Sequence, residues 1–230
     1  MYLLENADKA YTSRRGTVHA LRDVSVEIPS GSCVTITGPS GSGKTTLLLT
    51  LGGLIRPTSG RVLFHGIDLG GLSDAELAKY RNQKVGFVLQ SFNLVPYLSA
   101  MENVIVPMMF MNGSNNGVAG RARDLLNRLG LDDRADHLPR ELSVGQQQRV
   151  AIARALGNNP EVILADEPTG NLDPQLSAEV LGILRELNEK DGRTVIMVTH
   201  SPEAARIGNR RLHLIDGACQ DGIPKDQVAV

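Results

Sequence analysis

The sequence has few aromatic residues and few cysteines. Only 3% of its 230 residues are aromatic, and it has no tryptophan. This leaves too little stacking surface for a protein that binds single-stranded nucleic acid on an aromatic platform. The two cysteines, Cys33 and Cys219, are far apart and form no C-x-x-C pair, so neither a disulfide framework nor a zinc site is indicated. A reducing compartment is expected.

An excess of charge and a long hydrophobic run are also missing. The 24 lysines and arginines balance 25 aspartates and glutamates, leaving a net charge of −1 and no basic field for nucleic acid or anionic lipid. The longest apolar run, Val104–Met111, has eight residues, is interrupted by Pro107 and is too short to span a bilayer. The start, Met1–Asp8, does not resemble a signal peptide. We expect a cytosolic chain without a nucleic-acid partner, so any membrane crossing would fall to another chain.

Short β-branched runs alternate with helical patterns and predict an α/β fold with a mainly parallel sheet. Two of the runs, in Val162–Ala165 and Thr194–Val198, are apolar without alternation, as is typical of central parallel strands covered on both faces. The other predicted strands are Val24–Ile28, Cys33–Thr37, Val62–Phe64, Val85–Leu89 and Leu212–Ile215.

The interval from Ser99 to Leu156 has helical patterns and no convincing strand, which predicts a helical subdomain inserted into the α/β body. We expect one domain over residues 1–220, with its core at 1–90 and 160–220 and the helical subdomain at about 95–158. The turn formers Asn112–Gly117 predict a surface loop. Residues 221–230 are expected to form a tail.

The segment Gly38–Thr45 matches the phosphate-binding pattern G-x-x-x-x-G-K-[ST] between the predicted strand Cys33–Thr37 and a helical run, Thr46–Leu51. Glycines let backbone N–H groups converge on phosphate oxygens, and the helix N-terminus adds partial positive charge. Lys44 would reach the β- and γ-phosphates, and Thr45 would offer its hydroxyl to Mg²⁺. A glycine-rich turn with a surface lysine is the less favoured alternative. The other predicted nucleotide-binding residues of this P-loop are Gly38, Pro39, Ser40, Gly41, Ser42, Gly43 and Thr46.

Two acidic residues follow the apolar run Val162–Ala165. Asp166 ends a buried strand, where a carboxylate would face the phosphates and hold Mg²⁺ through water. Glu167, one residue further, is predicted to be the general base that polarises water. Solvated acids at a strand end are the alternative, and the P-loop in the same chain argues against it. ATP and Mg²⁺ are the expected substrate and cofactor.

Between these elements, Leu142–Val150 reads LSVGQQQRV, which resembles the L-S-G-G-Q signature of ABC-type ATPases. Ser143 is predicted to cap a helix whose N-terminus points at an anion. The resemblance implies that Ser143, Val144, Gly145 and Gln146 contact the γ-phosphate of a nucleotide held by a second subunit. It therefore implies a homodimer with composite sites.

Other residues match this family in order along nearly the whole chain. Tyr11 resembles the aromatic residue that stacks on adenine, and Gln90 resembles the glutamine that reaches Mg²⁺ and joins the core to the helical subdomain. Asp173 lies in a segment that resembles the D-loop. His200 resembles the histidine that contacts the γ-phosphate. The resemblance implies the ABC ATPase fold, in which a P-loop NTPase core carries an N-terminal antiparallel β region and an inserted helical subdomain.

Two longer segments, Phe87–Pro96 and Ile163–Asp173, resemble the lipoprotein-release and macrolide-export branch of ABC transporter ATP-binding subunits. The resemblance implies that ATP-driven dimer closure powers an integral membrane permease subunit with a large extracytoplasmic domain, to which periplasmic or outer-membrane components can be added. The chain would be peripheral, at the cytoplasmic face of the bacterial inner membrane. The work could be export or release of lipoprotein, macrolide, peptide or haem, or regulation of cell-wall hydrolases at division.

The resemblance also implies a groove for a coupling helix of the permease, bordered by residues 90–98. Phe92, Leu94, Val95 and Tyr97 offer apolar anchors there, and internal packing of the same side chains is an equal alternative. One position of the signature departs from the family pattern: Val144 stands where the family usually has glycine. A β-branched residue is costly there if the backbone needs a positive φ or must approach phosphate closely, so hydrolysis or dimer closure is expected to be weakened.

Two rival functions use the same phosphate cradle. A soluble ABC ATPase of DNA repair or translation usually has a long coiled-coil insertion or two tandem ATPase units, and 230 residues with one P-loop allow neither. A small-molecule kinase would have an acceptor pocket where this chain has Ser143–Gln146.

Overall fold

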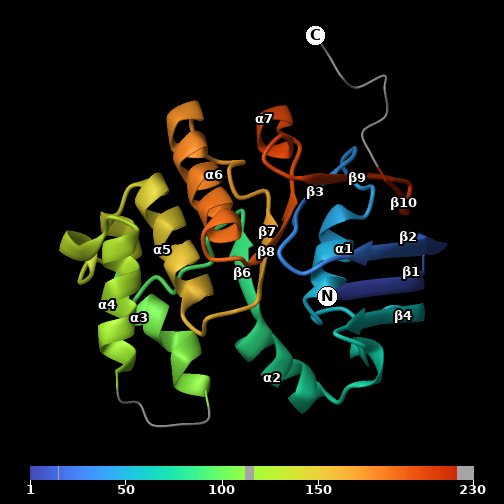
Figure 1. The fold of residues 1–230 in the computed structure, drawn as a ribbon, viewed down its shortest axis with the longest axis horizontal. Helices are drawn as coiled ribbons and strands as arrows, with labels where there is room; N and C mark the ends of the chain where they lie inside the picture. Colours follow the sequence, from blue (N-terminus) through green and yellow to red (C-terminus); the bar gives the residue numbers. More distant parts are fainter. Residues whose placement is uncertain (15, 112–116, 222–230) are drawn as a thin grey trace.

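The computed structural model describes residues 1–14, 16–111 and 117–221, which form two sheets and a group of helices (Figure 1). The strands are β1 (Tyr2–Ser13), β2 (Gly16–Ile28), β3 (Cys33–Thr37), β4 (Ser59–Phe64), β5 (Ile67–Asp68), β6 (Val85–Leu89), β7 (Val162–Asp166), β8 (Thr194–Val198), β9 (Arg210–Ile215) and β10 (Ala218–Asp221). The α-helices are α1 (Lys44–Leu51), α2 (Asp74–Lys84), α3 (Ala100–Ile105), α4 (Val118–Arg128), α5 (Val144–Leu156), α6 (Pro174–Glu189) and α7 (Pro202–Ala205). Short 3-10 helices are η1 (Leu69–Gly71), η2 (Val106–Phe110), η3 (Asp132–Arg134) and η4 (Pro139–Glu141).

The central sheet has six strands in the order β10-β9-β3-β8-β7-β6. All neighbouring pairs from β9 to β6 are parallel, and β10 pairs with β9 antiparallel. The prediction of a mainly parallel sheet is therefore confirmed. Because the parallel strands end at one edge, the segments that follow β3, β6, β7 and β8 meet there, as is usual for a ligand site in an open α/β sheet.

Both faces of this sheet are covered, and alternate residues of β8 belong to different cores. Val195 and Met197 pack with the side that holds α3, α4, α5 and α6. Ile196 and Val198 pack with α1 and the N-terminal sheet. This two-sided burial is the reason that the central strands read as continuous apolar runs.

The N-terminal sheet has the order β2-β1-β4-β5, and its paired strands are antiparallel. Strand β1 was not among the predicted strands. Register shifts between Leu4 and Ala7, and again up to Ala10, break its side-chain alternation, and Asn6 has a φ of 47°. The predicted strand Val24–Ile28 is only the end of β2.

The described part of the interval between β6 and β7, which leaves out residues 112–116, consists of helices and their connections. No strand occurs in this described part. The predicted loop Asn112–Gly117 lies outside the described residues except for Gly117, and the division into core and helical subdomain stays a prediction. The prediction of a tail from residue 221 is wrong at its first residue. Asp221 is the last residue of β10. Its carboxylate accepts a hydrogen bond of 2.6 Å from the guanidinium of Arg210 on the neighbouring strand β9. Residues 222–230 lie outside the described part.

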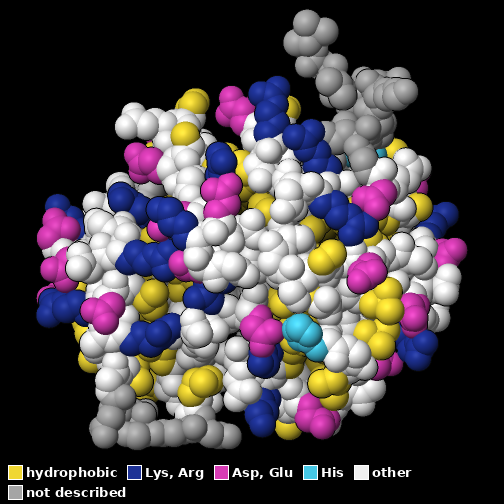
Figure 2. Space-filling view, viewed as in Figure 1, with side chains coloured by type: hydrophobic (Ala, Val, Ile, Leu, Met, Phe, Trp, Pro, Cys, Tyr) yellow, Lys and Arg dark blue, Asp and Glu magenta, His cyan; other side chains and the backbone are white. Residues whose placement is uncertain are grey.

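Charged side chains of both signs lie over the face shown in Figure 2. Apolar side chains on this face lie between them in small groups.

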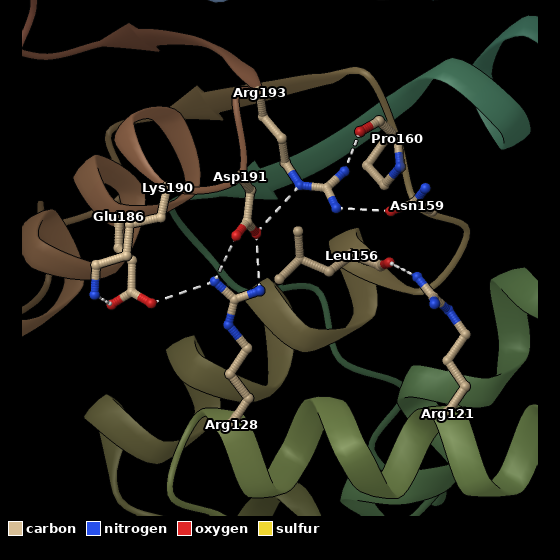
Figure 3. A network of polar contacts seen from close by, with 9 residues as sticks. All are labelled: Arg121, Arg128, Leu156, Asn159, Pro160, Glu186, Lys190, Asp191 and Arg193. Atoms are coloured by element: carbon tan, nitrogen blue, oxygen red, sulfur yellow. Dashed lines mark hydrogen bonds and ion pairs between the residues drawn. The ribbon is translucent and has the colours of Figure 1, made fainter.

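An ion network joins α4 to the connection between α6 and β8 (Figure 3). The Arg128 guanidinium donates to both carboxylate oxygens of Asp191, at 2.8 and 3.2 Å, and lies 3.4 Å from Glu186. Arg193 contacts the same aspartate at 3.6 Å and donates to the carbonyl of Pro160. The network therefore joins α4 and the segment before β7 to the connection between α6 and β8.

Replacing Asp191 with alanine should lower the free energy of unfolding at pH 7 by about 2 kcal/mol, because it leaves two guanidinium groups without their shared acceptor. The Arg128 hydrogen bond holds the pKa of Asp191 below its ordinary value of 3.8. The aspartate thus stabilises the fold above that ordinary value, and its contribution is lost as the pH falls through the lowered pKa. Urea unfolding at neutral and acidic pH measures both effects. The control Glu186→Ala should cost less than about 1 kcal/mol, and an equal loss in the two variants would contradict this account.

Candidate functional site

A cavity of about 590 Å³ opens at the carboxyl edge of the central sheet. It brings together four segments that are far apart in the sequence, namely the P-loop with the start of α1, and the residues that follow β6, β7 and β8. The predicted site residues that line it are Ser40, Gly41, Gly43, Lys44, Thr45, Thr46, Gln90, Asp166, Glu167 and His200. Ala20, Gly170 and Val198 line it as well, and none of them was predicted as a site residue.

The P-loop backbone has a shape that only glycine allows at its two ends. Gly38 has a φ of 146° and Gly43 a φ of 102°. A Cβ atom would lie 2.1 Å from the Leu214 carbonyl oxygen at the first and 2.0 Å from the Ala20 carbonyl oxygen at the second. Gly43 is also the N-cap of α1 and has no side chain to cap the first N–H groups of the helix. These groups therefore suit an anion such as phosphate.

Lys44 lies inside this loop and is only 5% exposed. Its Nζ donates to the carbonyls of Gly38 and Pro39 at 2.9 and 2.8 Å. Burial lowers the pKa of Lys44, and the nearby carboxylates of Glu167 and Asp166 oppose that shift. The ammonium is thus held at the cavity, close to where phosphate charge would lie.

Thr45 and Asp166 form a pair of hard oxygen donors. The Thr45 hydroxyl donates to Asp166 Oδ1 at 3.2 Å. Burial raises the pKa of Asp166, and the Thr45 hydrogen bond, Lys44 and His200 oppose the rise. The described residues hold no cluster of three or more His, Cys, Asp and Glu that could bind a metal without help. This pair fits Mg²⁺, which is usually held by one or two carboxylates together with substrate phosphates and water.

Glu167 is held in an unusual backbone conformation, with a φ of 45°. Its backbone N–H donates to the Val198 carbonyl at 3.0 Å, and its Oε2 accepts the His200 N–H at 3.2 Å. Its Oε1 lies 3.3 Å from His200 Nε2, is buried, and forms no hydrogen bond with the described residues. One carboxylate oxygen therefore accepts the His200 backbone N–H, and the other lies beside the His200 ring.

Gln90 and His200 complete the wall of the cavity. Gln90 directly follows β6, and its backbone carbonyl accepts the Asn171 amide at 3.1 Å. A Cβ at Gly170 would come 3.0 Å from Gln90 Nε2, so the glutamine lies against the segment after Glu167. The His200 side chain is 51% exposed.

The signature residues lie on another part of the chain and do not line this cavity. The predicted N-cap is confirmed: Gln146 N–H donates to Ser143 Oγ at 3.3 Å, and Ser143 N–H donates to Gln146 Oε1 at 2.9 Å. Val144 is the first residue of α5 and is 44% exposed. It is not among the residues with positive φ, so the backbone strain considered for a β-branched residue there does not occur. The other reason for a cost, close approach to phosphate, stays a prediction.

Several other predicted residues do not line the cavity. Tyr11 is on β1, 44% exposed, with its ring centroid 5.2 Å from Lys9 Nζ. Asp173 caps α6 by accepting the Leu176 N–H at 2.9 Å. Ser42 is buried in the P-loop, and its carbonyl accepts the Gly217 N–H at 3.1 Å.

The four predicted docking residues differ in their surroundings. Leu94 is partly buried against the helical core, whereas Tyr97 is 78% exposed. Phe92 has a φ of 58°, and its carbonyl accepts a hydrogen bond of 2.6 Å from Arg154. The backbone of Val95 bonds the side chain of Asn103.

A second cavity, of about 760 Å³, lies between α2, β6, η2 and α5. Its apolar wall includes Phe87, Leu89, Val106 and Phe110, and Phe110 is 74% exposed. This cavity was not predicted from the sequence, because it forms where four separate segments pack. The run Val104–Met111 was a signal for it, since its end places Met109 and Phe110 at the surface.

The glycine cradle, the buried lysine and the two strand-end carboxylates define a nucleotide-binding protein of the P-loop class. A family model described as ABC transporter matches residues 21–170. The chain belongs to the ABC transporter family, as an ATP-binding domain, and it is an ATPase.

Three relatives are similar to this chain over more than nine-tenths of its length. The chain is 48% identical to the uncharacterized ABC transporter ATP-binding protein MJ0796 of Methanocaldococcus jannaschii over 94% of both chains. A dimeric structure of that cassette, in a post-hydrolysis state bound to ADP and Pi, has a TM-score of 0.90 and 45% identity and covers 96% of this chain and 98% of its own. The lipoprotein-releasing system ATP-binding protein LolD of Myxococcus xanthus is 44% identical over 93% of this chain and 96% of its own. The macrolide export ATP-binding/permease protein MacB of Syntrophobacter fumaroxidans is 47% identical over 96% of this chain but only 31% of its own.

Proposed function

We propose that this chain is the ATP-hydrolysing subunit of a membrane transporter or mechanotransmission complex and works as a homodimer with two composite sites. The proposal rests on one observation: the signature residues at the start of α5 do not line the cavity that holds the P-loop. The P-loop, Asp166, Glu167 and His200 line one cavity, and the capped N-terminus of α5 lies outside it. A second copy would supply the missing anion contact, and the similarity to a dimeric cassette supports this.

In the proposed reaction, the residues of one cavity orient ATP and activate water. The P-loop N–H groups and Lys44 bind the β- and γ-phosphates, and the Glu167 carboxylate accepts the proton of the attacking water. His200 contacts the γ-phosphate and orients the Glu167 carboxylate. Thr45, Gln90 and Asp166, the last through water, would hold Mg²⁺, which when bound supplies positive charge to the phosphate oxygens. Most of the rate enhancement comes from positioning and electrostatics.

The partner chain contributes Ser143, Val144, Gly145 and Gln146 to the γ-phosphate, and Tyr11 of the first chain stacks on adenine. The two chains stay closed only while the γ-phosphate joins the P-loop of one to the signature of the other. Hydrolysis removes that differential contact and resets the dimer.

Replacing Val144 with glycine should raise the ATPase rate at saturating ATP about fivefold, which corresponds to about 1 kcal/mol. The isopropyl group is exposed at the start of α5, where it would stand between the helix and the partner's phosphate. Steady-state phosphate release measures the effect. An unchanged or lower rate would show that the valine does not hinder closure.

The membrane partner in this proposal is an integral permease subunit with a large extracytoplasmic domain, joined by periplasmic or outer-membrane components. No helix in the described part of the chain is long and apolar enough to cross a membrane. The chain would sit peripherally at the cytoplasmic face of the bacterial inner membrane. The similarity to LolD and MacB supports lipoprotein or macrolide as the moved substrate, with peptide or haem export and division-type control of cell-wall hydrolases as the alternatives.

A coupling helix of the permease would dock in the second cavity and against the adjacent Phe92, Leu94, Val95 and Tyr97. The apolar wall and the exposed Phe110 suit the apolar face of a helix.

Replacing Phe110 with aspartate should therefore reduce recovery of a co-expressed candidate permease at least tenfold in a detergent pull-down, since a charge would be buried in an apolar contact. Ile67→Asp is the control, because Ile67 is 56% exposed and does not line the cavity. Equal recovery with both variants would place the docking surface elsewhere. Failure of the unmodified chain to recover a membrane protein would favour a soluble ABC ATPase.

A further inference from the structure

The signature helix α5 is joined to the segment that follows Glu167 by one buried hydrogen bond. Gln148 lies on α5 and is 0% exposed. Its Nε2 donates to the Pro168 carbonyl at 2.7 Å. A carbonyl oxygen can only accept, so the amide nitrogen must face it. The Oε1 of the same amide is buried and has no hydrogen-bond partner among the described residues. The Pro168 contact is therefore what places this polar group in the core.

A second contact joins the same two segments further along. Gly145 packs against Leu176, the third residue of α6, and a Cβ at this glycine would lie 2.7 Å from Leu176 Cδ2. The intervening Asp173 caps α6 through the Leu176 N–H. Between them, Gln148 and Gly145 hold both ends of the stretch from Pro168 to Leu176 against α5.

The residue next to this hydrogen bond needs external support. Glu167 has a φ of 45° and precedes a proline, and both features restrict its backbone. Such conformations persist where the surroundings over-determine them, and they are concentrated at functional sites. The surroundings of Glu167 supply bonds from its N–H to Val198 and from Gly170 N–H to its own carbonyl, each of 3.0 Å. Gln148 adds the support that comes from α5.

We propose that Gln148 is a positioning residue that couples α5 to the general base of its own chain, by fixing the Pro168 carbonyl and through it the backbone of Glu167. The inference rests on the proposed homodimer. In that dimer the N-terminus of α5 contacts the nucleotide of the partner, whereas Glu167 faces the nucleotide of its own chain. The Gln148 hydrogen bond thus links one composite site to the other, over the 20 residues that separate the two partners in sequence.

Mixed dimers with one competent site test this link. In such a dimer, the chain with Glu167→Gln does not hydrolyse the ATP in its own P-loop and contributes only its signature residues to the other site. Single-turnover hydrolysis therefore reports the Glu167 of the other chain. Placing Gln148→Met on the hydrolysing chain should slow that turnover at least tenfold, with ATP affinity unchanged. Placing it on the Glu167→Gln chain should leave the rate within twofold of the parent mixed dimer. Methionine keeps the length and burial of the side chain and removes the donor.

Gln147→Met on the hydrolysing chain is the matched control. Gln147 is on the same helix, and its amide donates to Leu142 at 3.1 Å without reaching the segment after Glu167. This variant should retain the parent rate. Provided that the chains still associate with ATP, three results would overturn the inference. Gln148→Met could slow hydrolysis only when placed on the Glu167→Gln chain, slow it in both placements, or slow it in neither. If the parent chains did not associate with ATP at all, the proposed function would fail first, and this inference with it.

Discussion

Replacing Glu167 with glutamine should lower the ATPase rate at least a hundredfold, the loss expected when a general base is removed, and should trap a closed dimer when ATP is added. The glutamine can still accept the His200 N–H that Glu167 Oε2 accepts at 3.2 Å, so the cavity keeps its shape. It cannot take a proton from water. ATP then stays intact, and the γ-phosphate continues to join the two chains.

Gel filtration with and without ATP measures this trapping, together with phosphate release. Glu203→Gln is the control, because Glu203 is exposed on α7 and does not line the cavity. That variant should hydrolyse ATP at the rate of the unmodified chain and should not accumulate as a dimer. A Glu167→Gln chain that eluted only as a monomer with ATP would contradict the sandwich of two chains.

Replacing Lys44 with methionine should weaken ATP binding at least a hundredfold, which corresponds to about 2.7 kcal/mol. The ammonium is the cation that the P-loop itself brings to the cavity, and methionine has a similar apolar stem without charge. Burial lowers the pKa of Lys44, which means that holding the charged form there is costly. Lys44 Nζ also donates to the Gly38 and Pro39 carbonyls, which the variant leaves without this donor, so thermal unfolding must show whether a loss of binding comes from misfolding.

Titration with a fluorescent ATP analogue, alongside thermal unfolding, measures both quantities. Lys190→Met removes one positive charge from a side chain that is 72% exposed and pairs with Glu186. This control should bind the analogue as tightly as the unmodified chain. Equal affinity in the Lys44 variant would show that the P-loop is not the nucleotide site.

Features with a local signal could be predicted from the sequence. The strands β3, β6 and β8 have their predicted bounds, because each is a short apolar run bounded by polar or turn-forming residues. The P-loop followed by a helix was predictable for the same reason, since glycine spacing and the following apolar run lie within one short stretch. Ser143 was predictable as a cap because its partner, Gln146, is three residues away.

Features that depend on distant segments were not predictable. The bulges of β1 hide its alternation, and β10 has only four residues, stabilised by pairing with β9. The left-handed backbone of Glu167 is held in part by Val198, and Gln148 bonds Pro168 across 20 residues, so both depend on segments that are distant in the sequence. The cavity around Phe110 likewise needs α2, β6, η2 and α5 together. None of these has a spacing rule that a single sequence could show.

The dependence of the ATPase rate on protein concentration tests the composite site most directly. If each site needs the signature of a second chain, the rate per chain at saturating ATP should rise with protein concentration and level off once the dimer is saturated. Adding an excess of Lys44→Met chains, which bring a signature but bind ATP at least a hundredfold more weakly, should raise the rate per unmodified chain at low protein concentration. A rate per chain that stayed constant down to the lowest measurable concentration, with only monomer present, would contradict the account.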